Sequence, residues 1–164
     1  MSLFPDQSPI RGQSHANRGK AFEAALEMQL GRYKREGWLV VRQYPAVLPQ
    51  GEGMARIVGK AAPDWMIYKA GLLVMVDAKS FQGERWPLSE VADHQAAWFD
   101  QAEVAGGAAG VVLHFEAQVW WMPWDVLGPW WHRWRNGGRP ATLNRDQLMQ
   151  VAKPCVGYDF LAVV

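Results

Sequence analysis

The order of helix-like and strand-like segments predicts an α/β fold, in which helices flank a mixed central β-sheet. Apolar residues recur at helical spacing near the start of the chain and again in its middle. Between and after these two segments lie apolar stretches that are typical of strands. The length of 164 residues suits one domain, which we expect at residues 17–164 after a flexible N-terminal arm over 1–16.

The first helix is expected over about residues 18–36, where apolar side chains recur at spacings of 4, 4 and 3. We place Asn17 as its N-cap and Gly37 at its end, because these residue types favour those positions. The apolar stripe that this spacing defines consists of Phe22, Leu26, Leu30 and Tyr33.

Residues 38–80 predict three strands and one projecting segment. The stretch "WLVVRQYPAV" at 38–47 is rich in β-forming residues and predicts the first strand. Residues 48–62 contain glycines and prolines that break regular structure, and we expect a protruding loop or β-ribbon there. "DWMIYK", the turn "AG" and "LLVMVDAKS" then predict a hairpin of two strands.

The second half of the chain predicts a helix, two strands and a helical appendix. Residues 89–104 have helical periodicity, with Ser89 as the expected N-cap. "AGVVLHF" and "QVWWMPW" predict strands, and "QGERWP" before the helix predicts a loop. "WDVLGPWWHRW" predicts a helix that Gly128 and Pro129 interrupt, "NRDQLMQVA" a short helix, and "YDFLAVV" a terminal strand or docked tail.

Charge and composition narrow the functional classes. The net charge is only +1, but residues 1–80 hold eleven basic and seven acidic side chains, whereas residues 81–125 hold one basic and seven acidic. A local basic surface matters more for phosphate binding than net charge, although unevenly spread solvated charges are the simpler interpretation. A single cysteine, no apolar run of membrane length and no signal-peptide pattern predict a cytoplasmic protein.

Tryptophan is the most unusual component of the sequence. There are ten tryptophans, and six of them lie in residues 120–134. Because tryptophan is large and mostly buried, a core or subunit interface is the first expectation, and stacking on unpaired bases is the alternative.

Three charged residues on the predicted hairpin form the sharpest candidate site. Asp64 precedes the turn by six residues and Asp77 follows it by six, so an antiparallel pair brings them together. Two neighbouring carboxylates repel unless they share a proton or a cation, and Mg²⁺ or Mn²⁺ suits such oxygen ligands. Lys79 projects from the same side of its strand as Asp77, where it can stabilise an oxyanion. This combination predicts phosphodiester hydrolysis.

The simpler interpretation is a surface salt bridge between Asp77 and Lys79, with Asp64 capping a turn. Two further residues add to the candidate site. Glu23 is a third carboxylate beside the stripe of the first helix, and Gln95 is a polar side chain on an apolar helix face. A buried amide requires a partner, and each of these residues taken alone also fits a structural role.

Four motifs, in this order along the chain, resemble the RecU-like Holliday junction resolvases of the PD-(D/E)XK nuclease superfamily. They are "NRGKAFEAAL" (17–26), "PDWMIYKAGLLVMVDAK" (63–79), "WPLSEVADHQ" (86–95) and "WRNGGRPATL" (134–143). The first half of the chain is also similar to the archaeal Holliday junction resolvases, and the compact length would suit a phage-encoded enzyme.

The resemblance implies a homodimer that binds a four-way DNA junction and nicks two strands symmetrically with Mg²⁺ or Mn²⁺. It implies metal ligands at Asp64, Asp77 and Gln95, a transition-state lysine at Lys79 and a first-helix acid at Glu23. Residues 48–62 match the stalk that enters the junction centre. Basic residues expected to hold DNA phosphates are Arg18, Lys20, Arg56 and Lys60.

The sequence departs from the family pattern at three places. Asp77 stands where the family often has glutamate, and Ala62 replaces a threonine two residues before the first aspartate. The stalk segment is also shorter. Two alternatives stay open at this point: a nuclease of the same superfamily that acts on linear or damaged duplex DNA, and a DNA-binding module without catalytic activity.

Overall fold

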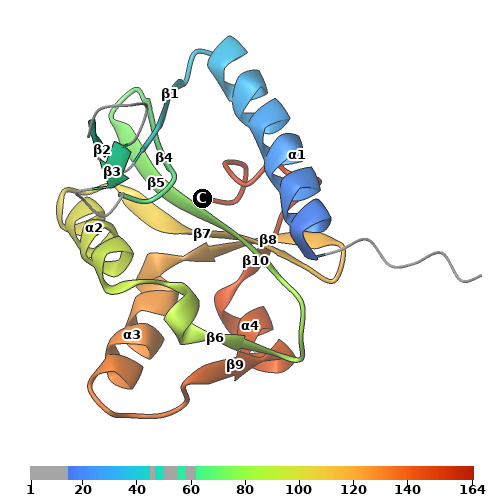
Figure 1. Cartoon of the computed structure of the whole chain (residues 1–164), viewed down its shortest axis with the longest axis vertical. Helices are drawn as coiled ribbons and strands as arrows, with labels where there is room; N and C mark the ends of the chain where they lie inside the picture. Colours follow the sequence, from blue (N-terminus) through green and yellow to red (C-terminus); the bar gives the residue numbers. More distant parts are fainter. Residues whose placement is uncertain (1–14, 45–46, 50–54, 58–61) are drawn as a thin grey trace, which may run out of the picture.

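The computed structural model describes residues 15–44, 47–49, 55–57 and 62–164, and the expected Lys60 contact lies outside these ranges. A mixed six-stranded sheet forms the centre of the molecule, with strand order β1-β4-β5-β7-β8-β10. Only the neighbours β5 and β7 run parallel, and the other pairs are antiparallel. The predicted α/β class with a mixed sheet between helices is therefore confirmed (Figure 1).

The sheet contains the strands β1 (Leu39–Arg42), β4 (Trp65–Lys69), β5 (Leu72–Phe81), β7 (Ala108–Phe115), β8 (Gln118–Pro123) and β10 (Lys153–Pro154). Two further pairs are β2 (Val47–Pro49) with β3 (Ala55–Ile57), and β6 (Arg85–Pro87) with β9 (Thr142–Asn144). The helices are α1 (His15–Arg35), η1 (Leu88–Glu90), α2 (Asp93–Val104), α3 (Trp124–Arg135) and α4 (Arg145–Val151). Within the described part of the chain, no helix is long and apolar enough to cross a membrane.

Helix α1 covers one face of the sheet. Its predicted stripe is buried as expected, with Leu26 fully inaccessible, and it packs against the sheet residues Ile67, Val74 and Val76. Burying each such side chain contributes about 2 kcal/mol. The helix begins two residues before the expected N-cap Asn17, and it ends at Arg35, just before Gly37, whose φ of 88° only glycine adopts readily.

Helices α2 and α3 cover the other face, over β5 and β7 (Figure 1). Here Phe99 of α2 and Trp124 of α3 lie in contact, with ring centroids 5.2 Å apart, above Val111 and Leu113. The two faces of the sheet therefore form two separate hydrophobic cores. Alternate residues of β5 and β7 point into different cores because successive strand side chains point to opposite faces.

The tryptophan-rich segment packs mainly against the sheet, which answers the first expectation for it. Trp121, Trp124 and Trp131 are buried, and the ring of Trp121 lies against Gly110 of the neighbouring strand β7. A Cβ on Gly110 would lie 2.3 Å from the Met122 carbonyl oxygen, so only glycine fits there. The other three tryptophans of the segment, Trp120, Trp130 and Trp134, are partly buried.

Three expectations about local structure are wrong. Helix α3 runs through Gly128 and Pro129 without a break. Gly128 is buried against the Trp124 indole, and a side chain at this position would crowd that ring. The expected loop "QGERWP" contains β6, which pairs with β9 more than fifty residues later. Ser89 lies in the short helix η1, and the N-cap of α2 is Ala92.

The C-terminal residues form a docked tail, one of the two expected outcomes. Phe160 is fully inaccessible and contacts Tyr33 edge-on, with ring centroids 5.4 Å apart. The Tyr33 hydroxyl donates to Asp159 Oδ1 at 2.8 Å and accepts from the Leu161 backbone N–H at 3.1 Å. The tail thus completes the core beneath α1.

Candidate active site

The β4–β5 hairpin brings the two predicted aspartates together. Its two-residue turn at Ala70 and Gly71 has positive φ at both positions, which matches the right-handed twist of a tight hairpin. The resulting register pairs Trp65 with Val76, so that Asp64 and Asp77 occupy the next facing positions. The expected proximity of these residues follows directly from this register.

Asp77 is the buried centre of the group. Its side chain is 1% exposed, and Oδ1 accepts a hydrogen bond of 2.5 Å from Gln95 Nε2. Its other oxygen, Oδ2, lies 2.8 Å from Lys79 Nζ, which makes an ion pair. Lys79 is the partner of Oδ2 among the described residues, and no further hydrogen bond to this buried oxygen is formed.

Burial raises the pKa of Asp77 to about 6, because the charged carboxylate loses most of its hydration. The positive charge of Lys79 opposes this shift, and the negative charge of Asp64 adds to it. Asp77 is therefore a carboxylate held at an electrostatic cost. A bound cation is one way in which such a cost is offset.

Asp64 is partly buried and is held by the backbone of the neighbouring strand. Its Oδ2 accepts a hydrogen bond of 2.9 Å from the Ala78 N–H, between Asp77 and Lys79. This contact was not predicted from the sequence. The hairpin register was the available signal, since it places Asp64 opposite the segment that contains Ala78.

Gln95 connects helix α2 to the carboxylate pair. Its Oε1 accepts from the Ala92 N–H at 3.0 Å, while its Nε2 faces Asp77. The resemblance implies that Gln95 is a metal ligand, whereas the partner of this partly buried amide here is Asp77 itself. To serve as the expected metal ligand, the amide would have to rotate so that its oxygen faced the site.

The structure does not bring Glu23 into this group. Glu23 is exposed on α1, which covers the sheet face opposite to the one that carries Asp77 and Gln95. Nowhere among the described residues do three His, Cys, Asp or Glu side chains gather to hold a metal ion. Of the expected DNA contacts, Lys20 is exposed on α1, Arg18 lies within α1 and Arg56 within β3.

The residues present fit a divalent cation at this position. Two carboxylates face each other, and the buried Oδ2 of Asp77 has Lys79 as its partner among the described residues. Hard oxygen donors in small number suit Mg²⁺ or Mn²⁺, which keep several of their own waters. The Lys79 side chain, which pairs with Asp77, is 22% exposed.

A P-D dipeptide and a D-x-K triplet on adjacent strands of a mixed sheet flanked by helices define a protein of the PD-(D/E)XK nuclease class. Residues 17–155 match the family model RecU, described as recombination protein U. This match spans most of the chain, and the chain belongs to the RecU family.

Among solved structures, the chain is similar to Archaeoglobus fulgidus Hjc, a Holliday junction resolvase from an archaeal hyperthermophile. The TM-score is 0.43 and the sequence identity is 13%, with 63% of this chain and 78% of that chain covered. No curated protein sequence matches the chain significantly.

Proposed function

We propose that this protein is an endonuclease that resolves four-way DNA junctions by divalent-metal-dependent hydrolysis during DNA recombination and repair. The observation that carries the proposal is the buried Asp77 carboxylate, held between Gln95 and Lys79 and facing Asp64, in a chain of the RecU family. Action on junction DNA places the protein in the cytoplasm of a bacterium or of a phage-infected cell.

In this mechanism Asp64 and Asp77 would hold Mg²⁺ or Mn²⁺, with Gln95 as a third donor if its amide rotates. Such a metal supplies a more acidic water and charge neutralisation at the phosphate. Hydrolysis adds water across one P–O bond, and negative charge grows on the phosphate oxygens. Lys79 donates hydrogen bonds to that charge, an interaction of a kind that accelerates a reaction by about 10²–10³.

Asp77 and Gln95 also act through their placement. The hydrogen bond from Gln95 fixes the orientation of the Asp77 carboxylate, so that Oδ2 faces Lys79 and Asp64. Residues that orient metal ligands in this way typically contribute about 10–100-fold in affinity or activity. The exposed Lys20, together with Arg18, Arg56 and Lys60, would hold DNA phosphates without reading sequence. A catalytic role for Glu23 remains a prediction.

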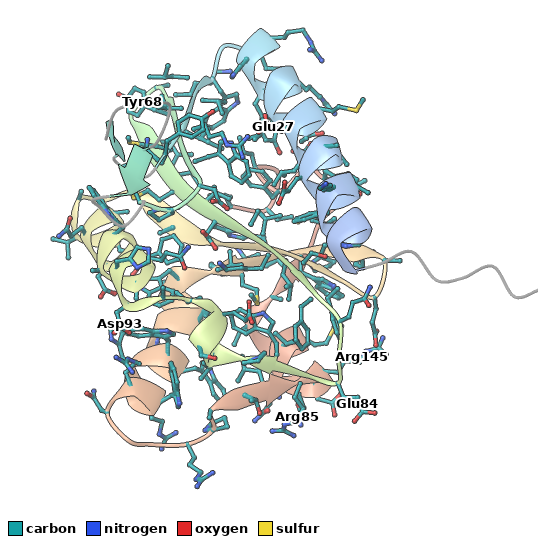
Figure 2. The ribbon with its side chains drawn as sticks, in the orientation of Figure 1. Glu27, Tyr68, Glu84, Arg85, Asp93 and Arg145 are labelled. Atoms are coloured by element: carbon teal, nitrogen blue, oxygen red, sulfur yellow. The ribbon has the colours of Figure 1, made fainter. Side chains whose placement is uncertain are left out.

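The homodimer that symmetric nicking requires has a candidate interface on the uncovered part of the sheet. On the face opposite α1, helix α2 packs over β5 and β7, and side chains of β1 and β4 stay exposed. Leu39 is 59%, Val41 38% and Tyr68 46% exposed on this face, and Figure 2 labels Tyr68. Contiguous exposed apolar side chains mark interaction surfaces, and we propose that a second copy of this chain covers them.

We expect the double change Leu39→Glu and Val41→Glu to convert the dimer to a monomer. In a two-fold symmetric interface each introduced charge is present in both subunits, so dimerisation should weaken at least about 100-fold. Sedimentation velocity measures this directly, and Val104→Glu is the matched control because Val104 is 91% exposed on α2. A double variant that remains dimeric would place the interface elsewhere.

The function itself is tested by cleavage of a labelled synthetic four-way junction beside a linear duplex of the same sequence, with Mg²⁺ and with EDTA. We expect symmetric, metal-dependent nicks in the junction and at least about 100-fold slower cutting of the duplex. Equal cutting of both substrates would replace this proposal with a general duplex nuclease. Tight junction binding without cleavage in any metal would indicate a binding module.

A further inference from the structure

A second surface near the site combines an aromatic side chain with arginines. Trp134 lies at the end of α3 and forms a wall shared by two open cavities. One cavity of about 400 Å³ is also lined by His94 and Arg135, and the other, of about 250 Å³, by Gly138 and Arg139. We call the three residues Trp134, Arg135 and Arg139 the Trp134 surface.

The two arginines of the Trp134 surface differ in their contacts. The Arg135 guanidinium lies 2.6 Å from Asp93 Oδ2 and 5.5 Å from the centre of the Trp134 ring. Both partners of this ion pair are substantially exposed, so it contributes little to folding stability. Within the described part of the chain, no ion pair involves the exposed Arg139. Folding alone therefore does not account for this group.

The turn that follows α3 presents Arg139 on a defined backbone. The Gly137 N–H donates to the Trp134 carbonyl and the Gly138 N–H to the Arg133 carbonyl, both at 2.9 Å. A Cβ on Gly138 would lie 2.8 Å from the Arg133 oxygen, so the turn closes tightly only with glycine. A tight turn orders the groups it carries before a ligand binds, which reduces the entropic cost of binding.

The first turn of α2 connects the Trp134 surface to the carboxylate pair. Asp93 and His94, which border the larger cavity, come directly before Gln95 in the first turn of α2, and Gln95 holds Asp77. Figure 2 shows Asp93 at the surface between α2 and α3. A ligand that contacts both the Trp134 surface and the carboxylate pair would therefore pass the first turn of α2.

Charge along α2 favours an anionic ligand at this end. The far end of the helix is acidic: burial and the nearby carboxylates of Asp125 and Asp100 raise the pKa of Glu103 there. A polyanion is repelled from that end, whereas the start of α2 lies next to Arg135 of α3, whose charge Asp93 offsets, and Arg139 in the following turn adds an unpaired positive charge. An indole that borders one cavity with Arg135 and another with Arg139 suits a nucleic-acid strand, since the ring packs on a base or sugar and the guanidinium groups bind phosphates.

We propose that the Trp134 surface is a second DNA contact, which binds the sugar-phosphate backbone of a junction arm next to the phosphate that is cut. This inference rests on the function proposed above, because it assigns the substrate of that function to an additional surface. Arg135 and Arg139 are binding residues here, and Asp64, Asp77 and Lys79 keep the chemistry.

The test compares the double variant Arg135→Gln, Arg139→Gln with the control Arg145→Gln. Arg145 is likewise an exposed arginine paired with a carboxylate, Glu116 at 3.2 Å, and it lies on the opposite side of the molecule from Asp93 (Figure 2). Binding of a fluorescent four-way junction and of a linear duplex is measured by anisotropy in EDTA over a series of salt concentrations, after circular dichroism has shown the fold intact.

We expect the double variant to bind the junction about 10- to 100-fold more weakly. We also expect the slope of log K against log salt to fall by about 2, since each phosphate contact contributes about 0.9. The control should stay within about twofold of the unmodified protein. Unchanged affinity and slope would overturn the inference, and so would an equal loss in the control, which would indicate diffuse net charge.

The same data separate this inference from the proposed function. If the unmodified protein binds duplex as well as it binds junction, the resolvase proposal fails, while the slope measured on duplex still tests the Trp134 surface. If the unmodified protein binds neither DNA, both proposals fail together. If it prefers the junction and the variants behave as it does, only the Trp134 surface is rejected.

Discussion

The substitution Asp77→Asn is expected to abolish junction cleavage while leaving junction binding intact. The amide keeps an oxygen that can accept from Gln95, so the hydrogen bond that now measures 2.5 Å can persist and the fold with it. It removes the negative charge that pairs with Lys79 and that would hold a divalent cation with Asp64. A metal is worth several kcal/mol to such a reaction, which corresponds to at least about 10³-fold in rate.

Single-turnover cleavage of a labelled junction in Mg²⁺ measures this effect, with anisotropy on the same junction as the binding control. The matched variant is Asp146→Asn, an exposed aspartate in the first turn of α4, which should cut at nearly the rate of the unmodified protein. If Asp77→Asn cuts at the unmodified rate, the assignment of the active site is wrong. If it loses binding as well, Asp77 has a role in folding or DNA contact that the mechanism does not include.

The second large effect concerns the pH dependence of stability in the metal-free protein. The pKa of Asp77 lies at about 6 in the folded state, against an ordinary value of 3.8, because burial disfavours the carboxylate. A raised pKa means that the folded protein binds this proton more tightly than the unfolded chain does. The stabilising contribution is complete below about pH 4 and is lost as the pH rises through about 6.

The free energy of unfolding of the unmodified protein should therefore fall, relative to Asp77→Asn, by about 2 kcal/mol between pH 4 and pH 7.5. Urea titrations of both proteins in EDTA measure this difference. Loss of the Lys79 partner in the variant adds an offset, but the offset does not depend on pH in this range. A difference that stays constant from pH 4 to 7.5 would contradict the buried, proton-binding state of Asp77.

Addition of Mg²⁺ at pH 7.5 provides a second check on the same site. A ligand that binds only the folded state stabilises it, so the metal should raise the free energy of unfolding of the unmodified protein and leave Asp77→Asn nearly unchanged. Equal stabilisation of both proteins would mean that the metal binds somewhere else.

Local patterns were sufficient to predict the hairpin and the proximity of its two aspartates. Positive-φ residues at Ala70–Gly71 and alternating apolar residues define the register of β4 and β5, and that register alone brings Asp64 to Asp77. The apolar stripe of α1 and the end of this helix before Gly37 were likewise predictable from the sequence, because each depends on contacts within a few residues. The family motifs share this property, since each lies within one short stretch of sequence.

Contacts between segments that are distant in the sequence could not be predicted from local patterns. Glu23 was expected near the aspartates, but α1 docks on the other face of the sheet, and the docking face depends on every element that packs there. The break expected at Pro129 did not occur, since burial of α3 through Trp124, Leu127 and Trp131 outweighs the cost of one missing backbone hydrogen bond.

By itself, the sequence determined the α/β class, the hairpin and the residues Asp64, Asp77 and Lys79, because strand alternation and turn chemistry are properties of neighbouring residues. The tertiary structure decided the state of these residues. Only the packing of α2 over β5 excludes water from Asp77 and directs the Gln95 amide to it, and desolvation, which raises the pKa of that carboxylate, is a property of the assembled core.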